Sequence, residues 1–247
     1  MKPAIGRGRP KRYTTADGER VPSVTELLGY CKNWQPLLAW NFKRGLETAL
    51  AHLQAQNEPP QQLEYADLKP CWRMRYETRD EAADIGSLVH AMIERHYAGE
   101  DIQNLLFDQP AEVALRASRA FANFLDWYTG QSLTAVELER PLVSENLKFA
   151  GTFDMLARHA RGHLTLIDWK SSKGLYAEVP IQLAAYRLLL QEHGSDVQDA
   201  HALRISKSGT NWEQQWYGGE LLDAAEKVFL QCVRMHHAMA AMSKVAG

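Results

Sequence analysis

Apolar and polar positions follow a helical period in the first half of this chain, and the pattern changes to short extended runs after residue 130. Apolar residues at helical spacing predict helices, whereas short β-rich runs between turn residues predict strands. The expected helices cover residues 34–52, 80–97, 111–128, 180–192 and 220–242. The expected strands cover residues 134–143, 148–158, 164–169, 202–206 and 212–217. This order predicts an α/β fold with a helical N-terminal half.

The segment before the first long helix carries two local signals. Residues 12–15 and 19–22 flank Asp17-Gly18, a turn-forming pair, and together predict a small hairpin. Ser23 and Glu26 have the spacing of a capping box, in which each side chain binds the other residue's backbone amide. We therefore expect a helix to begin here and to run through Leu28.

Composition places the chain among ordinary globular proteins. Of its 247 residues, 45% are hydrophobic and 23% are charged, which excludes collagen-like, disulfide-scaffold and intrinsically disordered proteins. No apolar run approaches the ~18 residues of a membrane-spanning helix, and residues at the N-terminus lack the apolar core of a signal peptide. The three cysteines are far apart and predict neither disulfides nor a cysteine metal site. We expect a cytoplasmic protein that makes no membrane contact.

The net charge of −2 combines two regions of opposite sign. Residues 1–12 contain five basic residues and no acid, which leaves 23 basic against 30 acidic residues in the rest. Arg7-Gly8-Arg9 resembles the core of an AT-hook, in which arginines enter the minor groove of DNA, so Arg7 and Arg9 are candidate DNA contacts. The same segment is equally compatible with a solvated, disordered tail. We expect a basic tail over residues 1–12.

The rest of the chain is expected to form one domain. It divides into three parts: a mainly helical part, a sheet core and a C-terminal helix. The domain covers residues 13–247, and its parts cover residues 13–130, 131–218 and 219–247.

Three motifs in the sheet region carry candidate chemistry: Gly151-x-x-Asp154, Asp168-x-Lys170 and Gln182-x-x-x-Tyr186. Residues two apart in a strand share a face, so Asp168 and Lys170 project together. If the two strands pair as a hairpin, Asp154 can lie beside Asp168. Converging carboxylates repel unless a cation neutralises them, and hard oxygen ligands suit Mg²⁺ or Mn²⁺. A lysine beside such an ion is placed to act on a nucleophilic water, which suits phosphodiester hydrolysis.

These motifs in this order resemble the PD-(D/E)xK nuclease superfamily, and within it the RecB-like exonucleases. The resemblance extends upstream to Gly86-x-x-x-His90, which is similar to the helical histidine motif of those enzymes, and to Val21-Pro-Ser-Val-Thr, similar to the opening of phage-type and mitochondrial single-strand exonucleases. It covers roughly residues 20–220. The resemblance implies a restriction-endonuclease-like fold, a mixed β-sheet flanked by helices.

The resemblance also implies roles for single residues. His90, Asp154, Asp168 and the backbone carbonyl of Trp169 would bind Mg²⁺ or Mn²⁺, and Lys170 would position the attacking water. Gln182 and Tyr186, one helical turn apart, would contact DNA or brace the active-site strand.

Two departures from the superfamily's patterns are visible. Phe153 stands where the superfamily's name has proline, a variation common in RecB-like members. Three scattered cysteines cannot supply the four that iron–sulfur members need, so we expect no iron–sulfur cluster.

Several neighbouring residues allow two interpretations each. Glu94 either orients the imidazole of His90 or is a solvated surface residue. One of Glu137 and Glu139 is a candidate acidic group near the metal, and we expect Glu139 to lie on a solvated strand face. Ser172 and Lys173 either reach phosphate or cap the loop. Their residue types alone do not decide between these roles.

The sequence therefore predicts a metal-dependent DNA nuclease, an exonuclease acting on single strands or duplex ends. The resemblance suggests a phage recombination or repair context, with recombination or repair proteins as partners. The alternative is a catalytically silent DNA-binding or recombination accessory protein that uses the basic tail and a nuclease-like fold. The complete set of two acids and a lysine argues against it, because clustered carboxylates repel phosphate.

Overall fold

The computed structural model of the protein describes residues 4–5, 10, 12–31, 35–55, 64, 85–170, 174–207, 209 and 211–246. Contacts divide the chain into two compact units. One comprises Met1–Lys32 with Leu88–Gly247, and the other comprises Asn33–Ser87. The smaller unit contains α2 (Gln35–Gln54), where a helix is expected from the sequence. The expectation of one continuous domain over residues 13–247 stays a prediction.

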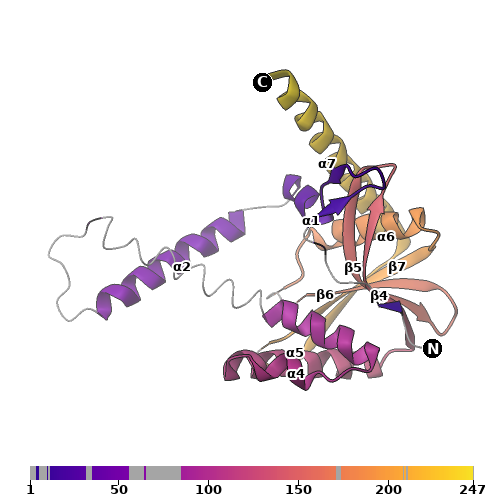
Figure 1. The fold of residues 1–247 in the computed structure, drawn as a ribbon. Coiled ribbons are helices and arrows are strands. Elements are labelled where there is room, and N and C mark those ends of the chain that lie inside the picture. Colours follow the sequence, from indigo (N-terminus) through magenta and orange to yellow (C-terminus); the bar gives the residue numbers. More distant parts are fainter. Residues whose placement is uncertain are drawn as a thin grey trace. The chain divides into compact units, whose positions relative to one another are not determined.

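The larger unit contains the β-strands and most of the helices (Figure 1). Its strands are β1 (Ala4–Ile5), β2 (Tyr13–Thr14), β3 (Arg20–Val21), β4 (Leu133–Ser144), β5 (Phe149–His159), β6 (Leu164–Lys170), β7 (Val197–Ile205) and β8 (Trp212–Tyr217). Its helices are α1 (Val24–Leu27), the 3₁₀ turn η1 (Leu28–Tyr30), α4 (Gln103–Phe107), α5 (Ala111–Thr129), α6 (Val179–Glu192) and α7 (Gly219–Ala246). A further helix covers residues 85–98, and its residues from 88 onward belong to this unit.

Six strands form one mixed sheet in the order β1-β4-β5-β6-β7-β8. The pairs β4–β5, β5–β6 and β7–β8 are antiparallel, whereas β1–β4 and β6–β7 are parallel. Parallel neighbours cannot be joined by a tight turn, and α6 is the helix in the connection from β6 to β7. β5 lies in the interior of the sheet and is buried along nearly its whole length. The expected mixed sheet flanked by helices is confirmed.

Helices cover both faces of this sheet (Figure 1). α6 and α7 pack together on one face, where Phe153 of β5, Leu183 of α6 and Phe229 of α7 belong to the same buried cluster. α5 packs on the other side, where the ring of Phe124 lies 5.3 Å from the ring of Trp169 in β6. The sheet is therefore the middle layer of three, and its central strands are shielded from water.

The predicted capping box is present at the start of α1. The backbone amide of Glu26 donates to Ser23 Oγ at 3.2 Å, and the amide of Ser23 donates to Glu26 Oε2 at 2.7 Å. This capped segment is attached to the sheet, because the amide of Ala150 donates to the carbonyl of Pro22 at 3.0 Å. The predicted hairpin before it is also confirmed, since β2 and β3 pair antiparallel.

The predicted elements agree with the observed ones except in a few places. β7 begins at Val197 rather than at residue 202, because its parallel pairing with β6 extends the strand, and a hairpin signal alone does not reveal that. Ala4 and Ile5, in the expected disordered tail, pair with Glu137 and Leu138 at the sheet edge, where an edge strand offers unpaired backbone groups. Residues 80–84 of one expected helix lie outside the described residues.

No helix in the described part of the chain combines the length and the apolar character needed to cross a membrane.

Gly151 of β5 gives a direct test of the packing between β5 and α6. A Cβ at this position would lie 2.7 Å from Cε1 of Tyr186 and 3.0 Å from Cγ2 of Val24. Both neighbours are buried, so Gly151→Ala should lower the free energy of unfolding by about 1–3 kcal/mol, as overpacking does in other cores. Urea denaturation measures this change.

Gly130→Ala is the matched control, because the nearest atom to its added Cβ is 3.5 Å away. This variant should unfold within about 0.5 kcal/mol of the wild type. Equal unfolding midpoints for Gly151→Ala and the wild type would contradict the close packing of β5 on Tyr186.

Candidate active site

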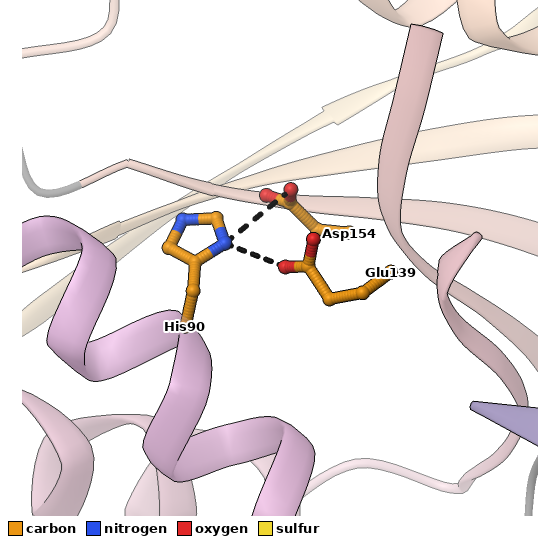
Figure 2. Close-up of side chains that lie close together, drawn as sticks. All are labelled: His90, Glu139 and Asp154. Atoms are coloured by element: carbon orange, nitrogen blue, oxygen red, sulfur yellow. Dashed lines mark hydrogen bonds and ion pairs between the residues drawn. The ribbon is translucent and has the colours of Figure 1, made fainter. Parts of the chain in front are cut away.

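Three potential metal ligands converge between the helix of residues 85–98 and the β4–β5 pair: His90, Glu139 and Asp154 (Figure 2). One ligand atom from each lies within 4.8 Å of the other two. His90 Nδ1 is 2.6 Å from Glu139 Oε1 and 3.6 Å from Asp154 Oδ1. In the hydrogen bond between His90 Nδ1 and Glu139 Oε1, the imidazole is the donor when Nδ1 carries the proton. Within the described ranges this is the one such group with metal-binding geometry.

The register of β4 on β5 places the two carboxylates together. Leu138 pairs with Met155 and Arg140 pairs with Phe153, so Glu139 stands opposite Asp154. Glu139 has a φ of 46°, in the left-handed region, and the ladder shifts register just before it, between Ala135 and Glu137. A residue other than glycine in this conformation costs about 1–3 kcal/mol, and such strain concentrates at functional sites. β4 therefore departs from regular strand geometry at the residue that faces His90.

Burial makes this arrangement electrostatically demanding. Asp154 is 1% exposed and Glu139 is 4% exposed. Two adjacent buried carboxylates are unfavourable without a compensating cation and hydrogen bonds. His90 supplies part of that compensation, and its ring lies 5.4 Å from the ring of Trp169. One imidazole nitrogen and two carboxylates also form a donor set that suits a divalent ion such as Mn²⁺ or Mg²⁺.

The remaining predicted residues form a connected chain of contacts next to this group. Asp154 Oδ2 accepts the backbone N–H of Trp169 at 3.0 Å, which joins the group to the end of β6. Lys170 Nζ lies 2.5 Å from Asp168 Oδ2 and donates to Gln182 Oε1 at 2.8 Å. Gln182 Nε2 in turn donates to the hydroxyl oxygen of Tyr186 at 3.0 Å. Strand parity correctly predicts that Asp168 and Lys170 project together.

A family model described as PD-(D/E)XK nuclease superfamily matches residues 62–240. The chain belongs to the PD-(D/E)XK nuclease superfamily. The mixed sheet with flanking helices agrees with the restriction-endonuclease-like fold expected for this superfamily, and superfamily members use divalent metals.

Other comparisons add little to this assignment. No curated protein matches the chain. A solved structure titled "Crystal structure of SSO0001" is similar over 64% of this chain and 85% of its own, with 11% sequence identity and a TM-score of 0.29.

For this superfamily member, the observed group differs in composition from the expected ligand set. His90 and Asp154 belong to it as expected, but the third member is Glu139, while the Asp168 carboxylate is held by Lys170. The metal roles of Asp168 and of the Trp169 carbonyl stay predictions.

The expectation of a solvated face for Glu139 is wrong. Strict alternation would place Glu139 on the same face as Glu137, which binds Arg140 at 2.8 and 2.9 Å. The left-handed backbone at Glu139 breaks this alternation and buries its carboxylate instead. A glutamate in this conformation has no sequence signature, so the pairing of acids on one strand was the single available hint. The expected supporting role of Glu137 near the metal stays a prediction.

Glu94 lies in the electrostatic neighbourhood of the group. Burial, and next the charge of Glu139, raises the pKa of the Glu94 carboxyl above its usual range. Its role in orienting the imidazole stays a prediction. The candidate DNA contacts Arg7, Arg9, Ser172 and Lys173 lie outside the described residues.

Glu139 and Glu213 provide a matched pair of variants for testing the metal site. Glu139→Gln should weaken Mn²⁺ binding by about 10-fold to 100-fold, because it removes one charged oxygen donor from the group. Glu213→Gln removes the same charge from a residue of β8 that is bound to Arg204, and it should change the affinity less than about 2-fold. Isothermal titration calorimetry measures both dissociation constants, and equal affinities for the two variants would exclude Glu139 from the site.

Proposed function

We propose that this protein is a metal-dependent deoxyribonuclease of the RecB-like type, an exonuclease that hydrolyses phosphodiester bonds at DNA ends or in single strands. The observation that carries the proposal is the hydrogen bond that joins the candidate metal ligands to the Asp168–Lys170 segment. Asp154 belongs to the group of His90, Glu139 and Asp154. Its carboxylate accepts a hydrogen bond from the backbone amide of Trp169, the residue between Asp168 and Lys170. One hydrogen bond to the Trp169 amide therefore connects the candidate metal ligand Asp154 to the residue next to Lys170.

His90, Glu139 and Asp154 would hold the ion, with Asp168 as a further candidate ligand. A bound Mg²⁺ or Mn²⁺ would supply Lewis-acid stabilisation of phosphate charge and an acidified water. Because imidazole is a poorer ligand for Mg²⁺ than for transition metals, this mixed set should favour Mn²⁺ in affinity.

Lys170 is the residue that we assign to charge stabilisation and water positioning. Its Nζ donates a hydrogen bond to Gln182 Oε1 and forms an ion pair with Asp168 Oδ2, so its position is fixed before substrate binds. A preorganised ammonium group stabilises negative charge that develops on phosphate without reorganisation during the reaction. Lys170 thus serves the reaction by its placement.

Of the two roles open to Gln182 and Tyr186, their burial supports the bracing role. Gln182 is 8% exposed and Tyr186 is 3% exposed, so both are mostly covered by protein. Gln182 binds Lys170 with its oxygen and Tyr186 with its nitrogen. Gln182 and Tyr186 therefore hold Lys170 in a fixed position relative to α6.

The alternative, a silent DNA-binding accessory protein, has less support. A module that only binds DNA gains nothing from buried carboxylates beside its phosphate contacts, because those charges oppose binding. A cytoplasmic location, partners in recombination or repair and a phage context remain part of the proposal.

Lys170→Ala and Asp168→Ala should each lower DNA hydrolysis by at least about 100-fold, the usual cost of removing a preorganised charged group. DNA affinity should stay within a few-fold of the wild type. The assay follows labelled linear single-stranded and duplex DNA with Mn²⁺, Mg²⁺ or EDTA, and EDTA should stop hydrolysis. Lys148→Ala, at a surface lysine that pairs with Glu19 and Glu145, is the control and should retain full activity.

The substrates also separate the competing functions. A circular single strand should resist degradation if the enzyme requires an end, and its digestion would replace the exonuclease proposal with an endonuclease. Metal-independent binding without hydrolysis of any substrate would favour the accessory protein. Full hydrolysis by both variants would show that the catalytic residues are assigned wrongly.

A further inference from the structure

A cavity of about 260 Å³ lies beside the candidate active site, between the β2–β3 hairpin, the start of α1 and β5. We call it the arginine pocket, because Arg12 and Arg20 line it, together with Tyr13, Ser23 and Thr152. It is too small for a drug-sized ligand but large enough for a phosphate with its attached sugar. None of these residues belongs to the acidic group at His90.

The lining of the arginine pocket suits an anion. Arg20 Nη2 lies 3.7 Å from Glu26 Oε1 in an exposed pair, whereas Arg12 has no ion-pair partner among the residues that the structure describes. The pocket therefore holds two guanidinium groups against the one carboxylate of Glu26. The Ser23 amide donates to that carboxylate and lowers its pKa, so the carboxylate is already engaged with the helix start.

Hydroxyl groups add uncharged donors to this lining. Tyr13 and Thr152 bind each other through their hydroxyl oxygens at 2.9 Å, and both border the cavity with Ser23. Arginine forks combined with hydroxyl groups are the usual protein contacts to phosphate oxygens of nucleic acids. The chemistry of the pocket thus points to a phosphate group.

The floor of the pocket is connected to the catalytic lysine. It is formed in part by Gly151, Thr152 and Tyr186. Tyr186 accepts a hydrogen bond from Gln182, and Gln182 accepts one from Lys170. Along β5, Thr152 precedes Asp154 by two residues, or about 7 Å. A strand with one phosphate at Lys170 would therefore carry a neighbouring nucleotide close to the pocket.

We propose that the arginine pocket binds a phosphate group of the DNA strand that is being degraded, with Arg12 and Arg20 as its charged contacts. The proposal rests on the proposed nuclease function, since it assigns a strand-binding subsite to that same site. The phosphate is either a terminal phosphate or an internal phosphodiester, and these two share the chemistry that the pocket recognises.

The test compares the full-length Arg12→Ala/Arg20→Ala variant with a Lys227→Ala/Arg234→Ala variant. The control removes the same charge from exposed positions of α7. Fluorescence anisotropy with labelled single-stranded oligonucleotides, in EDTA to prevent hydrolysis, gives the dissociation constant at several salt concentrations. The pocket variant should bind at least about 10-fold more weakly, and its salt slope should fall by about 1–2, because two phosphate contacts are lost. The control should bind within about 2-fold of the wild type, and its salt slope should be unchanged.

Oligonucleotides with a 5′-phosphate, a 3′-phosphate or unphosphorylated ends, and a circular strand, distinguish the source of the phosphate. A loss confined to one phosphorylated end assigns the pocket to a terminal phosphate, and an equal loss on the circle assigns it to an internal phosphodiester. Equal DNA affinity and salt slope for the pocket variant and the wild type on every substrate would overturn the proposal.

Two readouts separate this inference from the proposed function. Mn²⁺ affinity of the pocket variant should equal that of the wild type, which shows that the fold of β5 is intact. If the wild type binds DNA through the pocket but hydrolyses none, the nuclease proposal fails while the pocket stands. If the wild type hydrolyses DNA and the pocket variant binds it normally, the pocket inference alone fails.

Discussion

Two carboxylates held side by side in the interior of a β-sheet are the feature on which the site depends. Glu139 and Asp154 face each other across β4 and β5, both nearly inaccessible to water, with His90 against them. Their mutual repulsion and desolvation oppose folding, and the left-handed backbone at Glu139 adds strain. A sequence selected only for stability would place apolar residues here. The group is therefore best understood as a site prepared for a cation.

The topology of the sheet places Lys170, Gln182 and Tyr186 close to this group. Parallel pairing of β6 with β7 requires a crossover, and the crossover helix α6 carries Gln182 and Tyr186. Gln182 holds Lys170 at the end of β6, while the neighbouring Trp169 amide binds Asp154. The same connection that completes the fold thus also fixes the lysine relative to the acids.

Local sequence signals were sufficient for most of the fold and for part of the site. Helical periodicity, the Ser23–Glu26 capping box and the strand pattern around Asp154 and Asp168 all act over a few residues, and the structure agrees with them. The features that were missed depend on tertiary structure. Parallel pairing extends β7, sheet-edge pairing places Ala4 and Ile5 in a strand, and a left-handed backbone accompanies the burial of Glu139. The alternation of apolar and polar residues along a strand cannot predict the face of a residue such as Glu139, whose backbone departs from strand geometry.

Pulsed electron paramagnetic resonance of bound Mn²⁺ tests most directly whether His90, Glu139 and Asp154 form a metal site. Imidazole nitrogen coordinated to Mn²⁺ produces a hyperfine coupling that carboxylates and water do not produce. The wild-type protein should bind Mn²⁺ with nitrogen coupling from a single imidazole, and His90→Gln should abolish this coupling. Bound Mn²⁺ without nitrogen coupling in the wild type, or with unchanged coupling in His90→Gln, would contradict the assignment.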